Sequence, residues 1–343
     1  MGNAWGGSMK AWNWYAAPLI AVITGLAAGC ASGSGTAALS SLTTPEEPDV
    51  TVAALPAADL AGLYVAQDYG FFAQQGLHVR IEKIASSAAV LAAQEKGQVD
   101  ITAGSYVAYI AAQAAGARFR ILAEASALQP DTRVLVISAN SSIKSVNDLV
   151  GKKIGLNGTN SIGTLLISAL LAQRGISPAK VTFVTDPGGF PAMPAELRDG
   201  TWDAAFLAEP YVTVAGENYG ERELADLDQG ATLDFPIDGY MATQAWAEKN
   251  PKTVAAFVRA IEEGQELADN DRAAVEHAME ESDNLPHRVT AVMALPDFPV
   301  GPVDETRIQR TAEAMIQFGL LGAQYTAEVQ QGNLVRSMIA PGS

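Results

Sequence analysis

Two distant segments of the chain end a helix and begin a strand with the same order of residue types. They are residues 96–101 (KGQVDI) and 199–204 (DGTWDA), in which a glycine is followed by an apolar residue, an aspartate and an apolar strand. Glycine and aspartate suit any helix-to-strand turn, so a single junction of this kind would mean little. Because the junction recurs at matching points of two strand–helix series, it predicts two lobes of similar architecture.

Short apolar strands alternate with helices around both junctions, which is typical of α/β folds with largely parallel sheets. Strands are predicted at residues 50–54, 77–82, 99–103, 153–156, 181–184 and 204–207. Helices are predicted at 60–68 and 86–96, and a third begins at Ile162 and stops at Gly175. The predicted fold class is α/β, with each lobe a mixed, mostly parallel sheet flanked by helices.

The chain becomes mainly helical after Pro236. Asn250 and Pro251 mark the start of a long amphipathic helix, and further helices are predicted at 305–318 and 327–338. These helices need an apolar surface, which the first lobe offers, so the chain should cross to the second lobe and return.

The two crossings form the predicted hinge, near residues 133–137 and 234–240. The predicted lobe 1 comprises residues 48–136 and 236–343, and the predicted lobe 2 comprises residues 137–235.

An uncharged apolar run, residues 12–28, follows Lys10 and leads to the single cysteine, Cys30. This order is typical of a secretory signal, and the run is too short and too rich in alanine and glycine for a membrane span. Small residues before a cysteine resemble the bacterial lipobox, although Leu26 stands four residues before Cys30 where three is usual. The resemblance implies a lipoprotein signal peptide at 1–29, lipidation of Cys30 and a flexible tether at 30–47. The alternative is an ordinary signal peptide with an incidental cysteine.

The net charge of the chain limits the classes of partner that it can be expected to bind. Acidic residues outnumber basic ones 38 to 22, for a net charge of −16, and no cluster of lysine and arginine occurs. Nucleic acid and anionic lipid headgroups are therefore excluded as expected partners. With one cysteine the exported domain can form no internal disulfide.

Polar residues gather where the predicted strands end. In open parallel sheets ligands bind beyond the carboxyl ends of strands, where hydroxyls and helix N-termini can hold an oxyanion. The candidate ligand-binding residues at these ends and at the return crossing are Asp59, Ser86, Ser87, Ser105, Tyr106, Thr159, Asn160, Ser161, Glu209, Tyr211 and Asp238. The competing interpretation is that each serine or threonine caps a helix, that the tyrosines only pack, and that Asp238 is a turn residue.

Asp59 and Glu209 bear on the charge of the ligand. If both line the pocket, they favour a nitrogen-bearing organic solute over a bare inorganic anion, because an unpaired buried carboxylate is costly. The alternative for Glu209 is an acid that braces the hinge loop.

Several stretches resemble one family in their order along the chain. Residues 60–66 (LAGLYVA), 69–72 (YGFF), 99–101 (VDI), 146–155 (VNDLVGKKIG) and 203–206 (DAAF) with Glu209-Pro210 carry the likeness. They resemble the solute-binding proteins of ABC importers for nitrate, taurine, alkanesulfonates and thiamine-pyrimidine precursors. The resemblance implies a type 2 periplasmic-binding-protein clamshell.

Such a clamshell is expected to close on a small-molecule solute and deliver it to an ABC permease and its ATPase subunit. The expected protein is a monomer without cofactor or metal, held by lipid on Cys30 at the outer face of the cytoplasmic membrane or in the periplasm.

Two other functions stay open. Fungal pyrimidine-synthesis enzymes share the architecture, but that resemblance implies a cysteine-rich motif and a reactive histidine, and this chain has one cysteine and scattered histidines, His78, His277 and His287. A receptor that reports ligand occupancy to a sensor kinase would use the same clamshell. No phosphate-binding loop, dinucleotide fingerprint or nucleophile elbow occurs in the sequence.

Overall fold

The computed structural model describes residues 44–339, whose strands form two separate five-stranded sheets. Sheet A has the order β2-β1-β3-β10-β4, and sheet B has the order β7-β6-β8-β5-β9. The strands of sheet A are β1 (Asp49–Ala54), β2 (His78–Lys83), β3 (Ile101–Ser105), β4 (Phe119–Ala127) and β10 (Pro236–Thr243). Those of sheet B are β5 (Arg133–Ile137), β6 (Lys153–Leu156), β7 (Thr182–Thr185), β8 (Ala204–Ala208) and β9 (Arg222–Asp226).

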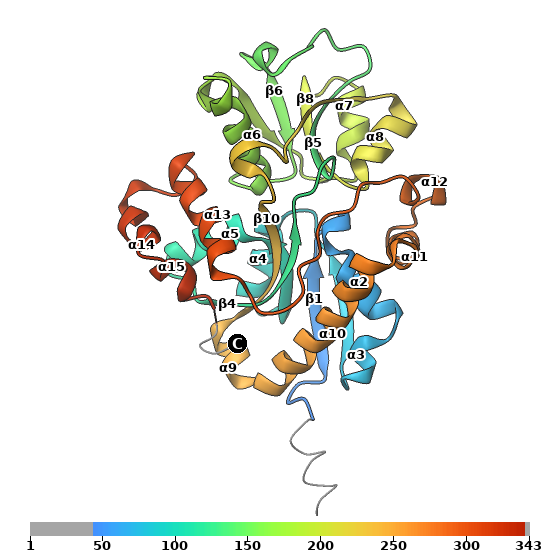
Figure 1. Cartoon of the computed structure of the whole chain (residues 1–343), viewed down its shortest axis with the longest axis vertical. Helices are drawn as coiled ribbons and strands as arrows, with labels where there is room; N and C mark the ends of the chain where they lie inside the picture. Colours follow the sequence, from blue (N-terminus) through green and yellow to red (C-terminus); the bar gives the residue numbers. More distant parts are fainter. Residues whose placement is uncertain (1–43, 340–343) are drawn as a thin grey trace, which may run out of the picture. The chain divides into compact units, whose positions relative to one another are not determined.

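The pairing within the sheets follows one plan. In each sheet the first three strands of the order pair in parallel, and the fourth strand, β10 or β5, pairs antiparallel with both of its neighbours. We use lobe 1 for sheet A with its helices and lobe 2 for sheet B with its helices (Figure 1). The predicted α/β fold with two lobes of similar architecture is confirmed.

The three helices that the sequence predicts between the strands are present as α2, α4 and α6, and further helices accompany them. Those of lobe 2 are α6 (Ile162–Gln173), α7 (Met193–Arg198) and α8 (Tyr211–Tyr219). Those of lobe 1 that alternate with its strands are α2 (Ala61–Asp68), α3 (Phe71–Gln74), α4 (Ser87–Glu95) and α5 (Tyr106–Ala114). The later helices are α9 (Gln244–Lys249), α10 (Pro251–Asn270), α11 (Arg272–Asp283), α12 (His287–Thr290), α13 (Glu305–Gln317), α14 (Thr326–Gln330) and α15 (Asn333–Arg336).

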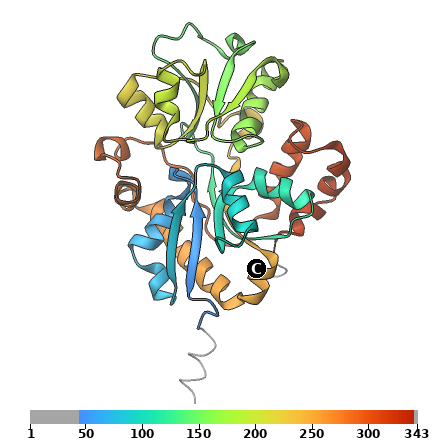
Figure 2. The ribbon, with the colours of Figure 1, turned by 180° about the vertical axis from the view of Figure 1, so that it is seen from behind.

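The later helices cover lobe 1, as expected: α10 and α11 pack on α2, and α13 and α15 pack on α5 (Figure 2). One helical prediction was wrong. The single helix expected at 327–338 is broken into α14 and α15. Gly332 lies between them with φ of 70°, a left-handed conformation that ends a helix.

The two repeated junctions have the same hydrogen bonds. The Asp100 carboxylate accepts the Thr51 amide of β1 at 2.9 Å, and the Asp203 carboxylate accepts the Lys153 amide of β6 at 2.8 Å. The preceding glycines, Gly97 and Gly200, both have positive φ. Each aspartate therefore fixes the start of the neighbouring parallel strand, which is a physical reason for the repeat.

Two crossings join the lobes, slightly displaced from the predicted positions. The first is residues 128–132, because β5 already belongs to sheet B at Arg133. The second is residues 227–235, ahead of β10. They lie side by side, since the Leu128 amide donates to the Phe235 carbonyl at 2.9 Å. The exact lobe limits stay predictions.

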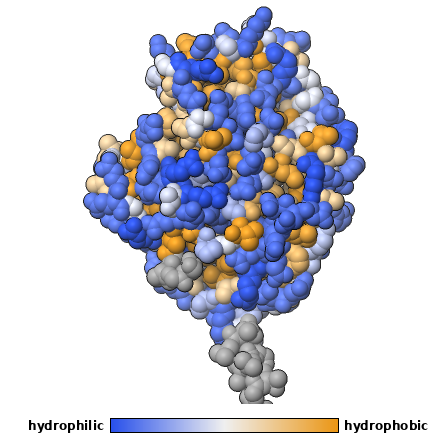
Figure 3. Space-filling view, viewed as in Figure 1, coloured by the Kyte–Doolittle hydropathy of each residue, from blue (hydrophilic) through white to orange (hydrophobic). Residues whose placement is uncertain are grey.

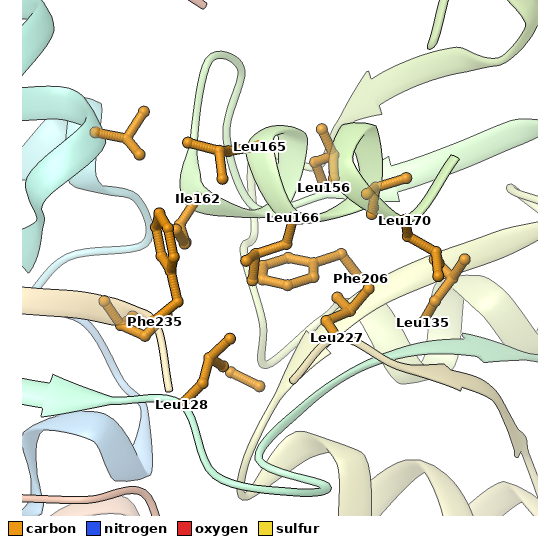
Figure 4. Close-up of a cluster of buried hydrophobic side chains, with 14 of the residues drawn as sticks. Leu128, Leu135, Leu156, Ile162, Leu165, Leu166, Leu170, Phe206, Leu227 and Phe235 are labelled. Atoms are coloured by element: carbon orange, nitrogen blue, oxygen red, sulfur yellow. The ribbon is translucent and has the colours of Figure 1, made fainter. Parts of the chain in front are cut away.

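The apolar core does not divide cleanly between the lobes. One buried cluster fills lobe 2 and continues through Leu128 and Phe235 of the crossings to α5 and α13 of lobe 1. Figure 4 shows Phe235 beside Ile162 at the start of α6. A second cluster lies between sheet A, α2 and α10. On the face drawn in Figure 3, hydrophilic residues predominate and apolar residues form small groups.

The segment before β1 is held against α10. The Glu46 carboxylate accepts the amides of Lys252 and Thr253 at the start of that helix, at 2.9 and 3.0 Å. The end of the predicted tether is therefore anchored on lobe 1. The predicted signal peptide and Cys30 lie outside the described residues.

Candidate functional site

Loops from the two lobes meet at the carboxyl ends of the parallel strands. The Ala58 amide, after β1, donates to the Glu209 carbonyl, after β8, at 2.8 Å. Gly189, after β7, lies against Ala85, after β2, so closely that a Cβ on the glycine would be 2.6 Å from the Ala85 carbonyl oxygen. We call this meeting of loops the junction; it is distinct from the two repeated helix-to-strand junctions described above. It brings together the loops that the sequence nominated for ligand binding.

A second close approach joins the serine loop of lobe 1 to the loop before α6. A Cβ on Gly158 would lie 3.6 Å from the Ser86 Cβ. That distance is an ordinary van der Waals contact, so the two loops lie close together here without any need for a glycine.

The candidate hydroxyls of lobe 1 serve the lobe itself. Ser86 and Ser105 cap α4 and α5, accepting the Ala89 and Val107 amides at 3.3 Å each. Ser87 accepts the Ser105 amide at 3.2 Å. All three oxygens therefore have backbone donors, as the capping interpretation expected.

The polar groups of lobe 2 differ. Ser161 occupies the N-cap position of α6, yet its hydroxyl makes no capping hydrogen bond. It is buried without a hydrogen-bond partner among the described residues, as are the hydroxyl of Thr164, Oδ1 of Asn157 and Oδ2 of Asp186. Buried polar atoms are rarely left unpaired, so this set points to a bound molecule or to ordered water. We call these four residues the open polar set.

The open polar set gathers at one place. Asn157 and Asp186 directly follow the paired ends of β6 and β7, Leu156 and Thr185, and Ser161 and Thr164 form the start of α6. The first amides of a helix have no partner within it and carry a partial positive charge. Two hydroxyls and these amides can hold an oxyanion, while the Asn157 and Asp186 oxygens accept from N–H or O–H groups.

Asp59 and Asp238 share one cation. Arg133, at the start of β5 in lobe 2, contacts a carboxylate oxygen of each at 3.0 Å. All three side chains are buried, and the guanidinium also lies 5.8 Å from the ring of Phe190 and 5.7 Å from that of Phe206. Burial raises the pKa of Asp238 to about 7, with Arg133 opposing the rise and Asp59 adding to it. The cluster links lobe 1 to the base of lobe 2 at the hinge.

Glu209 is buried and braces its own loop. Its carboxylate accepts the amide and hydroxyl of Thr213 at 3.1 and 2.8 Å, and the Ala294 amide at 3.2 Å. Burial raises its pKa to about 7. The argument for a nitrogen-bearing solute assumed that Asp59 and Glu209 were free. Both have internal partners, so any such preference must come from other residues.

The tyrosines and the remaining candidates occupy distinct places. Tyr106 is fully buried at the start of α5, with its hydroxyl against Gly239 and without a partner in the described structure. Tyr211 begins α8 and stacks on Phe190, with ring centroids 6.4 Å apart. Thr159 and Asn160 are exposed, and Asn160 has φ of 48°.

Sequence reasoning missed several polar residues of the junction. Asn157 and Asp186 were not among the candidates, and Thr164 lies inside a helix. The signal for Asn157 and Asp186 was present, because both directly follow strands. Arg133 was interpreted only as part of a crossing.

The described residues contain no group of three or more His, Cys, Asp or Glu side chains that could hold a metal ion. His78 and His287 are exposed and pair with Asp49 and Glu280. Within the described residues no helix is long and apolar enough to cross a membrane.

Known proteins resemble the chain in sequence and fold. The taurine-binding periplasmic protein of Escherichia coli (strain K12) is 29% identical over 222 residues, 64% of this chain and 66% of that protein. A 4-amino-5-hydroxymethyl-2-methylpyrimidine phosphate synthase of Saccharomyces cerevisiae is 27% identical over 225 residues, 62% of this chain and 64% of that enzyme. The chain therefore spans less than two thirds of either relative.

Solved structures share the fold. The alkanesulfonate-binding protein SsuA from Xanthomonas axonopodis pv. citri superposes with a TM-score of 0.71 at 18% identity, covering 86% of this chain and 99% of that one. The periplasmic-binding-protein fold expected from the sequence is thus confirmed. The family model described as "NMT1/THI5 like" matches residues 57–274, and the chain belongs to this family.

Proposed function

We propose that the chain is the extracytoplasmic solute-binding component of an ABC importer, closing its two lobes on a small organic solute that carries both an oxyanion and an N–H donor. The observation that carries the proposal is the open polar set of lobe 2, Asn157, Ser161, Thr164 and Asp186, beside the loops where the lobes meet. The relative that binds taurine supports this ligand class, since taurine combines a sulfonate with an amine.

The oxyanion is assigned to the start of α6. There the Ser161 and Thr164 hydroxyls and the first amides of the helix provide donors without any full positive charge. The nitrogen is assigned to Asn157 Oδ1 and Asp186 Oδ2, which can only accept hydrogen bonds. A nitrogen-bearing solute therefore remains our preference, on residues other than those first nominated.

Closure is proposed to occur at the two crossings. They are short, lie side by side, and share a hydrogen bond, so a rotation there would move one lobe against the other. We propose that Cys30 carries lipid that holds the protein at the outer face of the membrane, with the permease and its ATPase subunit as partners.

An enzymatic role is the second candidate, because the yeast relative is a synthase. The chain's single cysteine precedes the described residues, and the contacts of His78 and His287 are exposed ion pairs with Asp49 and Glu280. The cysteine-rich motif and reactive histidine expected of that enzyme have no counterpart at the junction, so we propose a binding protein.

A thermal-shift screen tests the proposal. Its probes are taurine, ethanesulfonate, nitrate, an aminopyrimidine and a polyamine. At a hundredfold its dissociation constant a true ligand adds about 2.7 kcal/mol of stability. We expect taurine or the aminopyrimidine to raise the melting temperature most. A shift with nitrate or the polyamine alone would contradict the proposed ligand class.

A further inference from the structure

A second set of polar groups lies on the lobe 1 side of the junction, outside the open polar set. Lys83 is the last residue of β2, two residues before Ala85, which contacts Gly189 of lobe 2. Its ammonium lies 5.3 Å from the centre of the Tyr64 ring and pairs with the carboxylate of Asp283 and the carbonyl of Ser282 at the end of α11. None of these residues was nominated by the sequence.

The surroundings of this ammonium are those of a site for organic cations. Aromatic faces together with a carboxylate are what proteins use to hold ammonium groups. The Asp283 side chain is only 6% exposed, and the Tyr64 hydroxyl is buried without a hydrogen-bond partner in residues 44–339. A nearly buried carboxylate is costly unless a cation or hydrogen-bond donors accompany it, and for Asp283 the Lys83 ammonium is that cation.

The negative charge of Asp283 also acts on tyrosines of both lobes. Burial raises the pKa of Tyr64 and of Tyr211, and in both cases the negative charge of Asp283 contributes to the rise. The Asp283 carboxylate pairs with the Lys83 ammonium, which lies 5.3 Å from the centre of the Tyr64 ring. We call Tyr64 and Asp283 the cation cage.

We infer that Lys83 is a specificity-determining residue: its own ammonium fills the cation cage and thereby excludes free organic cations from the junction. The proposal goes beyond the proposed function, because it concerns what the protein rejects. Selectivity of this kind is built by obstructing the wrong ligand rather than by adding contacts to the right one. A chain of net charge −16 attracts cations whether or not they are the solute that it binds.

The test replaces the Lys83 ammonium by an uncharged side chain and then adds a free organic cation. Lys83→Met keeps an unbranched apolar stem of similar length but leaves Asp283 without its partner. Tetramethylammonium is the probe, and binding is followed by broadening of its methyl NMR signal as protein is added. We expect at least a tenfold tighter dissociation constant for Lys83→Met than for the natural chain.

Two further variants make the result specific. The double variant Lys83→Met/Asp283→Asn removes the negative charge of the cage. It should bind tetramethylammonium no more tightly than the natural chain does. Lys152→Met breaks an ion pair with Asp203 at the start of a lobe 2 strand, at 3.2 Å, and should behave as the natural chain does. Thermal unfolding checks that each variant is folded, and Lys83→Gln replaces Lys83→Met if the latter is not.

The outcomes separate this inference from the proposed function. Equal tetramethylammonium binding by the natural chain and the folded Lys83 variant would overturn the inference, as would a gain that persists in the double variant. Neither result depends on whether taurine or any other oxyanion binds, because that is decided at α6 by the thermal-shift screen.

Discussion

The two lobes have the same sheet architecture, but the polar groups at the ends of their strands differ in their hydrogen bonding. Their sheets have matching strand orders, and Asp100 and Asp203 make the same hydrogen bond to the neighbouring strand. At the opposite ends of those strands the likeness stops. Lobe 1 pairs its serine oxygens with backbone amides, whereas lobe 2 leaves Ser161 and Thr164 unpaired within the described structure. The residues that build the fold are repeated, whereas the residues that we propose bind the solute differ between the lobes.

The difference assigns roles to the lobes. At these strand ends, the serine oxygens of lobe 1 already have backbone donors, whereas the unpaired hydroxyls of Ser161 and Thr164 in lobe 2 have free energy to gain from a ligand. We therefore propose that the solute binds first to lobe 2 and that lobe 1 closes over it.

The largest effect on stability is expected at Arg133, which belongs to lobe 2 and is held by two carboxylates of lobe 1. Arg133→Met leaves Asp59 and Asp238 buried without a cation, and should lower the free energy of unfolding by about 3–5 kcal/mol. Urea unfolding at neutral pH measures this loss. The matched control adds Asp59→Asn and Asp238→Asn, which should recover part of it. A loss below about 1 kcal/mol would mean that the cluster does not join the lobes.

Buried acids with pKa raised to about 7 occur in both lobes, Asp238 in lobe 1 and Glu209 and Glu221 in lobe 2. Between about pH 4 and 7 the folded chain keeps protons that the unfolded chain releases. The free energy of unfolding should therefore fall as pH rises through this window and level off above about pH 7.

Urea unfolding across that range, for the natural chain, Asp238→Asn and Glu209→Gln, measures the slope. Each variant should flatten it, by up to about one bound proton per group. Slopes identical to that of the natural chain would show that neither Asp238 nor Glu209 carries the effect.

The repeated junctions offer a matched pair. Asp100→Ala and Asp203→Ala each remove a charged acceptor from a strand amide, and each should cost about 1–2 kcal/mol of stability. Because the two bonds have nearly the same length, the losses should agree within about 0.5 kcal/mol. Chemical denaturation of both variants tests this, and markedly unequal losses would argue against the equivalence of the lobes.

The smallest stability effects distinguish the serines. Ser105→Ala removes a helix cap and should cost about 1 kcal/mol. Ser161→Ala removes a hydroxyl without a partner, so stability should change by less than about 0.5 kcal/mol. Taurine affinity should respond in the reverse order, with roughly a tenfold loss for Ser161→Ala, or about 1.4 kcal/mol, by calorimetric titration. A Ser161→Ala variant that binds as tightly as the natural chain would remove that hydroxyl from the site.

The sequence predicted the fold well because the fold rests on local signals. Apolar periodicity, helix caps such as Ser86 and stops such as Gly97 act within a few residues, and the strands that they predicted lie within one or two positions of those observed. No bounds were predicted for the strands β4, β9 and β10. The prediction of one helix at 327–338 was wrong because Gly332, in a left-handed conformation, interrupts it.

The candidate site was predicted less completely, because pairing is a tertiary property. Asp59 looked like a free acid until Arg133, far along the chain, was seen beside it. Ser86 and Ser161 look alike in sequence, since both precede helices, and only the three-dimensional structure shows that one hydroxyl is used and the other is not.

Hydrogen exchange of the first-turn amides of α6, residues 162–165, with and without saturating taurine, tests the central claim most directly. If the oxyanion binds at this helix start, exchange there should slow several-fold, while the amides that Ser105 caps at the start of α5 change little. Unchanged exchange across 162–165 at saturating taurine would contradict the assignment of lobe 2 as the binding side.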